Sequence, residues 1–96
     1  MQTRETYPNQ TIVYSKNNCQ MCNMTKKQLA ANNVPFIEVN IETQDDATMN
    51  EYITYLKEDI KLSTMPIVLP VKESGLDDWA GFVPGNIKKL AAYVKG

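Results

Sequence analysis

The sequence predicts an α/β domain in which three helices flank a four-stranded mixed sheet, in the order β-α-β-α-β-β-α. Two observations predict this class. Short runs of β-branched and aromatic residues alternate with longer stretches whose apolar residues recur every three or four positions. The last two strand-like runs are separated only by a turn, which indicates a hairpin. At 96 residues the chain accommodates one domain, residues 11–96, after a polar lead-in, residues 1–10, that we expect to be loose.

The first strand and helix are the clearest elements. Residues 11–15 form a β-branched and aromatic run typical of a strand that is buried on both faces. Asn17 and Asn18 interrupt this run, and a helix is expected over residues 20–33. Spacings of three and four residues place four of its side chains on one side, Met21, Met24, Thr25 and Leu29.

A second strand and a second helix follow. Residues 34–41 predict the strand, and Thr43 is the expected N-cap of the helix. Asp45 and Asp46 then fall in the first turn, where carboxylates are favoured by the helix dipole. The expected buried stripe is Met49, Tyr52, Ile53, Leu56 and Ile60. A βαβ unit of this kind implies parallel strands joined by a right-handed crossover.

The last part of the chain predicts the hairpin and a final helix. The third strand covers residues 67–71, and Pro70 is expected at its end or at a bulge because it has no N–H for the ladder. A turn follows, and the fourth strand lies within residues 76–82. Pro84 suits the first position of a helix. The apolar stripe of that helix is Ile87, Leu90, Ala91 and Val94.

Charge and hydropathy argue against several classes of function. Ten basic and 11 acidic residues give a net charge of −1, and no cluster of Lys or Arg exceeds a pair, so no nucleic-acid partner is expected. No apolar run suits a signal peptide or the roughly 18 residues of a membrane span. We therefore expect a cytoplasmic monomer, in a compartment where two cysteines are seldom a permanent structural bridge.

The pair Cys19 and Cys22 is the strongest functional signal, because a Cys-x-x-Cys motif falls between a strand and a helix. The free N–H groups of Met21 and Cys22 are expected to point at the sulfur of Cys19, which favours its thiolate. Cys22 lies one turn deeper. We therefore expect Cys19 to attack a substrate disulfide and Cys22 to resolve the mixed disulfide.

Two other roles for the cysteine pair are weaker. A structural zinc site needs four Cys or His ligands, whereas the chain has two cysteines and no histidine, so no metal is expected. A purely structural disulfide across two intervening residues closes a loop too short to stabilise the fold much. Redox chemistry is the interpretation that fits the position of the pair.

Three landmarks together resemble the thioredoxin superfamily and, within it, the glutaredoxins: the strand–Cys-x-x-Cys–helix unit of residues 11–33, the turn Thr64-Met65-Pro66, and the segment Trp79 to Pro84. The resemblance implies a thioredoxin-like, glutaredoxin-type fold. It also implies that Pro66 is cis and faces the disulfide, and that the backbone of Met65 pairs with an extended substrate.

The segment Trp79-Ala-Gly-Phe-Val-Pro84 is similar to the Trp-Ser-Gly-Phe-Arg-Pro segment of NrdH-redoxins. That resemblance implies electrons from NADPH through thioredoxin reductase, a flavoprotein, and delivery to a class Ib ribonucleotide reductase, with no cofactor bound to the chain itself. Ala80 and Val83 depart from this pattern, so the hydrogen bonds that hold the segment are expected to differ. The residues implied in substrate binding are Lys16, Gln20, Met21, Met65, Pro66, Trp79, Gly81 and Phe82.

Two alternatives stay open. A glutathione-dependent glutaredoxin would use Lys16 for a glutathione carboxylate, but Phe82, Val83 and Pro84 offer no acidic group after Gly81. A thiol-based sensor or regulatory adaptor would switch partner binding through the disulfide. Trp79 is interpreted either as a partner anchor at the rim of the site or as a half-buried residue that closes the hairpin.

Overall fold

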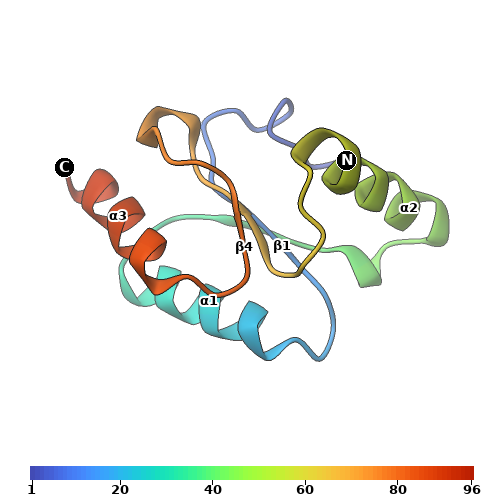
Figure 1. Ribbon diagram of the computed structural model, residues 1–96, viewed down its shortest axis with the longest axis horizontal. Coiled ribbons are helices and arrows are strands. Elements are labelled where there is room, and N and C mark those ends of the chain that lie inside the picture. Colours follow the sequence, from blue (N-terminus) through green and yellow to red (C-terminus); the bar gives the residue numbers. More distant parts are fainter.

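The computed structural model describes residues 1–96 and contains one four-stranded sheet (Figure 1). Its strands are β1 (Ile12–Ser15), β2 (Ile37–Asn40), β3 (Ile67–Leu69) and β4 (Trp79–Ala80), in the spatial order β2-β1-β3-β4. β1 runs parallel to β2 and antiparallel to β3, and β3 is antiparallel to β4. The mixed sheet and the element order predicted from the sequence are confirmed.

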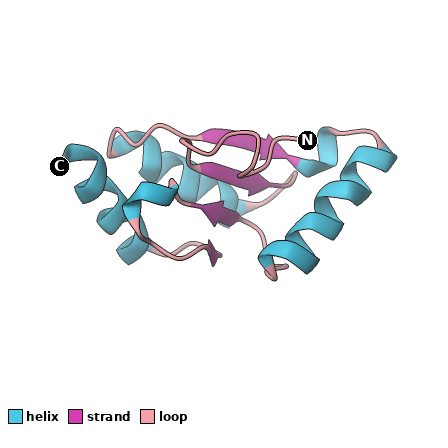
Figure 2. Cartoon of the chain, turned by 90° about the horizontal axis from the view of Figure 1, so that it is seen from above, coloured by secondary structure: helices cyan, strands magenta, loops and turns pink.

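Three helices cover the two faces of the sheet, as seen from above in Figure 2. They are α1 (Gln20–Ala31), α2 (Asp46–Thr54) and α3 (Pro84–Lys95). α2 lies on one face and continues into a π-helical turn, Tyr55–Ile60, whereas α1 and α3 lie side by side on the other face. Short 3-10 turns occupy Ile41–Thr43 and Lys72–Ser74. None of the helices has the length and apolar character that crossing a membrane requires.

Alternation along the strands divides the apolar core into two clusters, one on each face of the sheet. On the α2 face, Ile12 and Tyr14 of β1 pack with the aromatic and aliphatic side chains of the helix. On the opposite face, Val13 packs with Leu29 of α1 and with Leu90 of α3. The faces therefore have separate cores, and only the α1–α3 face carries the helix that begins at the cysteine pair.

Several predicted boundaries were wrong. The strands are shorter than their apolar runs, because a strand ends where its hydrogen-bonded neighbour ends and not where β-propensity ends. Thr43 is not the N-cap of α2, since it belongs to a 3-10 turn. Asp45 caps the helix instead, and its carboxylate accepts a hydrogen bond from the Thr48 N–H at 2.7 Å. Pro70 lies immediately after β3, as predicted.

The buried helical stripes also differ from the predicted ones. In α1 the buried residues are Cys22, Thr25 and Leu29, whereas Met21 and Met24 are 43% and 38% exposed. The helix is rotated so that Cys22 faces the sheet, which turns both methionines outward. Ile53 of α2 is 42% exposed, and Tyr55, which begins the wider π-helical turn, is buried. Val94, near the end of α3, is exposed as well.

Residues 2–4 of the lead-in are anchored to the fold, which differs from the loose segment expected for the whole lead-in. The Tyr14 hydroxyl donates to the Gln2 carbonyl at 2.7 Å, and the Gln2 N–H donates to the Tyr52 hydroxyl at 2.7 Å. The Arg4 N–H donates to the Tyr55 hydroxyl at 3.3 Å, and the Arg4 guanidinium forms an ion pair with Asp78. The placement of the domain boundary at residue 10 stays a prediction.

Candidate redox site

The sheet topology brings the three sequence landmarks to one end of the sheet. β1 leaves the sheet at Ser15, four residues before Cys19. Because β3 is antiparallel to β1, with Tyr14 opposite Ile67, the turn before β3 lies at this same end. Because β4 is antiparallel to β3, with Ala80 opposite Ile67, the residues after β4 also return to it. The order of the strands is what assembles the site.

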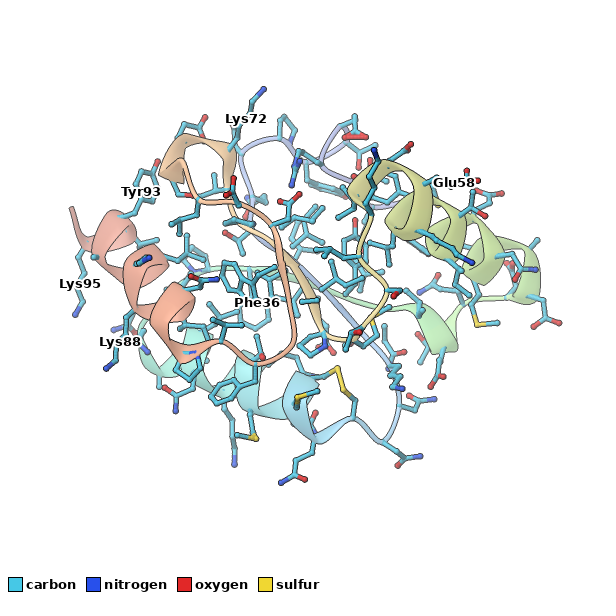
Figure 3. All side chains as sticks on the ribbon, in the orientation of Figure 1. Phe36, Glu58, Lys72, Lys88, Tyr93 and Lys95 are labelled. Carbon is cyan, nitrogen blue, oxygen red and sulfur yellow. A yellow bond between two sulfur atoms is a disulfide. The ribbon has the colours of Figure 1, made fainter.

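Cys19 and Cys22 form a disulfide at the start of α1, visible as the yellow bond in Figure 3. Their Cα atoms are 5.2 Å apart. Cys19 is the N-cap, with extended backbone angles of φ −116° and ψ 102°, and the Cys22 N–H donates to its sulfur at 3.2 Å. Of the two N–H groups predicted to face this sulfur, the structure has the hydrogen bond from Cys22.

The two cysteines differ in how deeply they are buried. Cys19 is 8% exposed, whereas Cys22 is completely buried. A disulfide partner that approaches from solvent therefore meets Cys19 first. When the disulfide is reduced, the free N–H groups and the dipole at the start of α1 favour a thiolate at this position. Burial of Cys22, in contrast, disfavours its charged form.

A backbone hydrogen bond links the turn before β3 to the segment after β4. The Met65–Pro66 peptide bond is cis, as the resemblance implied, and Pro66 is buried. The Pro66 carbonyl accepts a hydrogen bond from the Gly81 N–H at 2.8 Å. Gly81 has φ +84°, a left-handed conformation that favours glycine.

Apolar packing also holds this second segment, in which Ala80 and Val83 replace the polar residues of NrdH-redoxins. Phe82 and Val83 are half-buried and pack against the core of the α1–α3 face. The Val83 carbonyl accepts the N–H groups of Asn86 and Ile87 in the first turn of α3. The segment is thus fixed without the serine and arginine side chains.

A groove of about 330 Å³ lies between the end of α2 and the start of β3. It is lined by the predicted residues Lys16 and Met65, and by Ile53 and Lys57, which the sequence reasoning missed. Ile53 and Lys57 stand four residues apart, so they share one face of the helix. That spacing was the available signal, but Ile53 was placed in the core instead. The groove is mainly apolar and carries two lysines.

Trp79 is not a rim residue. It is 5% exposed and packs with Ile87 and Leu90 in the core of the α1–α3 face, so its ring is not available to a partner. Burial follows from its position in β4, whose side chains at that register point towards α3. Gln20 and Met21, the two residues between the cysteines, are both exposed beside the disulfide.

A polar network joins α1 to β2 behind the site. The Glu38 carboxylate accepts hydrogen bonds from Lys26 Nζ at 2.6 Å and from Ser15 Oγ at 3.0 Å. The Lys26 hydrogen bond, assisted by that of Ser15, lowers the pKa of Glu38 below its ordinary value. Sequence reasoning missed this network because its three members come from three different elements.

Comparisons with known proteins agree with this geometry. The glutaredoxin family model matches residues 11–70. The glutaredoxin-like protein NrdH from two strains of Lactococcus lactis is 36% identical over 81 residues, which cover 82% of this chain and 96% of the relative.

Two solved structures share the fold. A glutaredoxin from Archaeoglobus fulgidus superposes with a TM-score of 0.76 at 16% identity, over 100% of this chain and 97% of that one. The NrdH-redoxin from Escherichia coli superposes with a TM-score of 0.61 at 22% identity, over 83% and 92% of the two chains. The fold is therefore thioredoxin-like and of the glutaredoxin type, and the chain belongs to the glutaredoxin family, with NrdH-redoxins among its relatives.

Proposed function

We propose that the chain reduces disulfides in other proteins through Cys19 and Cys22, with electrons that come from NADPH through thioredoxin reductase. The observation that carries the proposal is the asymmetric disulfide at the start of α1, with Cys19 at the surface and Cys22 fully buried. This arrangement supports one attacking and one resolving cysteine. A class Ib ribonucleotide reductase is the proposed principal substrate, on the strength of the likeness to NrdH proteins.

The exchange proceeds in two balanced steps. The Cys19 thiolate attacks one sulfur of the substrate disulfide, a mixed disulfide forms, and the other substrate sulfur leaves as a thiolate. The Cys22 thiolate then attacks the Cys19 sulfur, and the second substrate sulfur leaves. The substrate gains two electrons and two protons in all, and the chain is left with the Cys19–Cys22 disulfide. The reductase returns two electrons to it, so the chain itself needs no bound cofactor.

Two features support a protein reductant over glutathione. The residues after Gly81 are Phe82, Val83 and Pro84, which offer no carboxylate to an α-amino group. The similar NrdH-redoxin from Escherichia coli is described by its thioredoxin-like activity profile. The two exposed methionines of α1, Met21 and Met24, provide an adaptable apolar surface beside the disulfide for a protein partner.

A coupled assay tests the proposal. The oxidised chain is mixed with NADPH and thioredoxin reductase, and NADPH consumption is followed with and without a disulfide protein as acceptor. In parallel it is offered glutathione with glutathione reductase. We expect rapid turnover in the first system and slow turnover in the second. Reduction by glutathione together with no reaction in the first system would overturn the proposal.

The two cysteines are tested by separate variants. Cys19→Ser removes the attacking sulfur and is expected to abolish turnover. Cys22→Ser is expected to accumulate a mixed disulfide with the acceptor protein, visible as a reducible adduct by mass. Lys27→Ala, an exposed change on the same helix, serves as the control and should turn over like the parent.

A second candidate function has one observation in its favour. Lys16 and Lys57 both line the groove next to Met65, and neither forms an ion pair, so the groove can receive a carboxylate. A glutathione-dependent glutaredoxin would use these lysines for that purpose. Under this alternative, Lys16→Gln and Lys57→Gln would each raise the KM for glutathione in the second assay system.

A further inference from the structure

Thr25 carries a buried hydroxyl that has no hydrogen-bond partner in the oxidised protein. The residue is completely buried, and its Oγ1 is one of two buried side-chain polar atoms without a partner. Leaving such a group unpaired is costly in a folded protein, and natural structures contain few of them. The usual helical solution, a hydrogen bond from threonine to a carbonyl of the preceding turn, is not made here.

The position of Thr25 relates it to the resolving cysteine. Cys22, Thr25 and Leu29 are the buried residues of α1, and Leu29 packs in the core of the α1–α3 face. Residues three apart in a helix are neighbours on its surface. Since side chains in a helix lean towards its N-terminus, Thr25 covers the turn that holds Cys22.

Reduction changes what Cys22 can offer to a neighbouring hydroxyl. In the disulfide, its sulfur carries no hydrogen and is at most a weak acceptor. When the disulfide accepts two electrons and two protons, Cys22 becomes a thiol, which is a donor, and the thiolate formed from it is a strong, charged acceptor. Thr25 is unpaired in the disulfide form, and reduction creates a donor and then a charged acceptor on Cys22.

We propose that Thr25 is a positioning residue for Cys22. Its hydroxyl accepts the Cys22 S–H in the dithiol form and donates to the Cys22 thiolate when that thiolate attacks the mixed disulfide on Cys19. The second role rests on the proposed function, whereas the first does not require any protein partner. The hydrogen bond forms only after reduction, so it favours the dithiol over the disulfide.

The first experiment measures the dithiol–disulfide equilibrium against dithiothreitol, which needs neither a reductase nor a substrate protein. Thr25→Val keeps the shape of the side chain and removes the hydroxyl. We expect it to shift the equilibrium towards the disulfide by about two- to threefold, the low end for a hydrogen bond, because the thiol is a weak donor. Thr25→Ser retains a hydroxyl and should stay close to the parent protein. Thr25→Ala gives a second hydroxyl-free variant, with the same expected direction.

Thr11→Val is the matched control. Thr11 is also a buried threonine, 3% exposed, but it lies at the far end of β1, where its hydroxyl accepts the Val71 N–H at 3.0 Å. Its replacement should lower the urea midpoint of the oxidised protein and leave the redox equilibrium unchanged. Thr25→Val should shift the redox equilibrium and should not lower the urea midpoint of the oxidised protein, because it removes an unpaired polar group from the oxidised core.

A second readout follows the thiolate itself. In a Cys19→Ser background, the rate of Cys22 alkylation against pH reports the pKa of Cys22, and Thr25→Val should move this profile to higher pH. The proposal is overturned if Thr25→Val leaves both the equilibrium and the profile unchanged, or if Thr11→Val shifts the equilibrium equally. If Thr25→Val shifts the equilibrium and the profile as expected, but thioredoxin reductase does not turn the parent protein over, only the proposed function is overturned.

Discussion

The two faces of the sheet satisfy their buried polar groups in different ways. On the α2 face, three tyrosines contribute hydroxyls to the core, and each hydroxyl is hydrogen-bonded to the backbone of the first four residues. Burial raises the pKa of Tyr14 and of Tyr55 above the ordinary value of 10, so both hydroxyls stay protonated even in alkaline solution. The core of this face therefore contains polar hydroxyl groups, and each of them has a hydrogen-bond partner.

The α1–α3 face is more aliphatic and holds both of the unpaired buried polar atoms, Thr25 Oγ1 and Trp79 Nε1. The helix that begins at the disulfide, α1, also covers this face. The difference indicates that the two faces have different roles. The α2 face holds the sheet and the first residues in one arrangement, and the opposite face leaves hydrogen-bonding capacity unused next to the group whose chemistry changes during turnover.

The largest expected effect comes from opening the aliphatic core of the α1–α3 face. Leu90 is completely buried in α3, so Leu90→Ala removes apolar contacts and leaves a cavity. We expect the free energy of unfolding to fall by about 2–5 kcal/mol, measured by urea denaturation. Val94→Ala, on the exposed side of the same helix, is the control and should cost far less. A loss from Leu90→Ala no larger than that from Val94→Ala would show that α3 does not close this core.

A smaller effect is expected from the paired polar core of the α2 face. Tyr14→Phe keeps the ring and removes the hydroxyl that donates to the Gln2 carbonyl. We expect a loss of about 1 kcal/mol in the free energy of unfolding and faster amide hydrogen exchange in the first residues. Tyr93→Phe, at an exposed position in α3, is the control. Unchanged exchange would mean that the tyrosine does not anchor this segment.

The sequence contained most of the local information about the fold and the site. The cysteine spacing, the Pro84 helix start and the turn before Pro66 are signals that a few neighbouring residues carry by themselves. Tyr52 was correctly assigned to the buried face of its helix. The predicted core stripe failed at Ile53, which lines the groove, while Tyr55 is in the core. From Tyr55 the helix widens into a π-helical turn, and no short sequence pattern predicts that change of period.

Contacts between distant residues were beyond the sequence reasoning. The Tyr52 hydroxyl meets Gln2, 50 positions away, and the Lys26–Glu38–Ser15 network joins three elements. Lys57 lines the groove together with Met65 because the π-helical turn that follows α2 lies next to the residues before β3. Such contacts depend on how the elements pack. Hydrophobic periodicity predicts which face of an element is buried, and it does not predict which polar groups then meet.

The ion pairs Glu38–Lys26 and Asp78–Arg4 are expected to change the stability of the fold with pH in opposite directions. Glu38 on β2 pairs with Lys26 of α1, and its pKa is lowered from an ordinary value of about 4.5. As pH falls through this region, the unfolded chain takes up the proton first, so the pair stabilises the fold above about pH 4.5 and this stabilisation is lost below. Glu38→Gln should therefore cost a few tenths of a kcal/mol at neutral pH, roughly the value of an exposed pair. Unfolding curves recorded at decreasing pH should show this difference vanish.

The smallest effect, of opposite sign, is expected at Asp78, the ion-pair partner of Arg4 in the anchored first segment. Burial raises the pKa of Asp78 above its ordinary value of 3.8, although the Arg4 guanidinium opposes the shift. The folded chain then binds the proton more readily than the unfolded chain, so stability is greatest below about pH 3.8 and falls as pH rises through the folded pKa. Asp78→Asn should accordingly stabilise the protein slightly at neutral pH, by roughly a few tenths of a kcal/mol, and lose this advantage in acid. If Asp78→Asn instead destabilises at neutral pH as Glu38→Gln does, the Arg4 pair outweighs burial, and both ion pairs hold the fold in the same way.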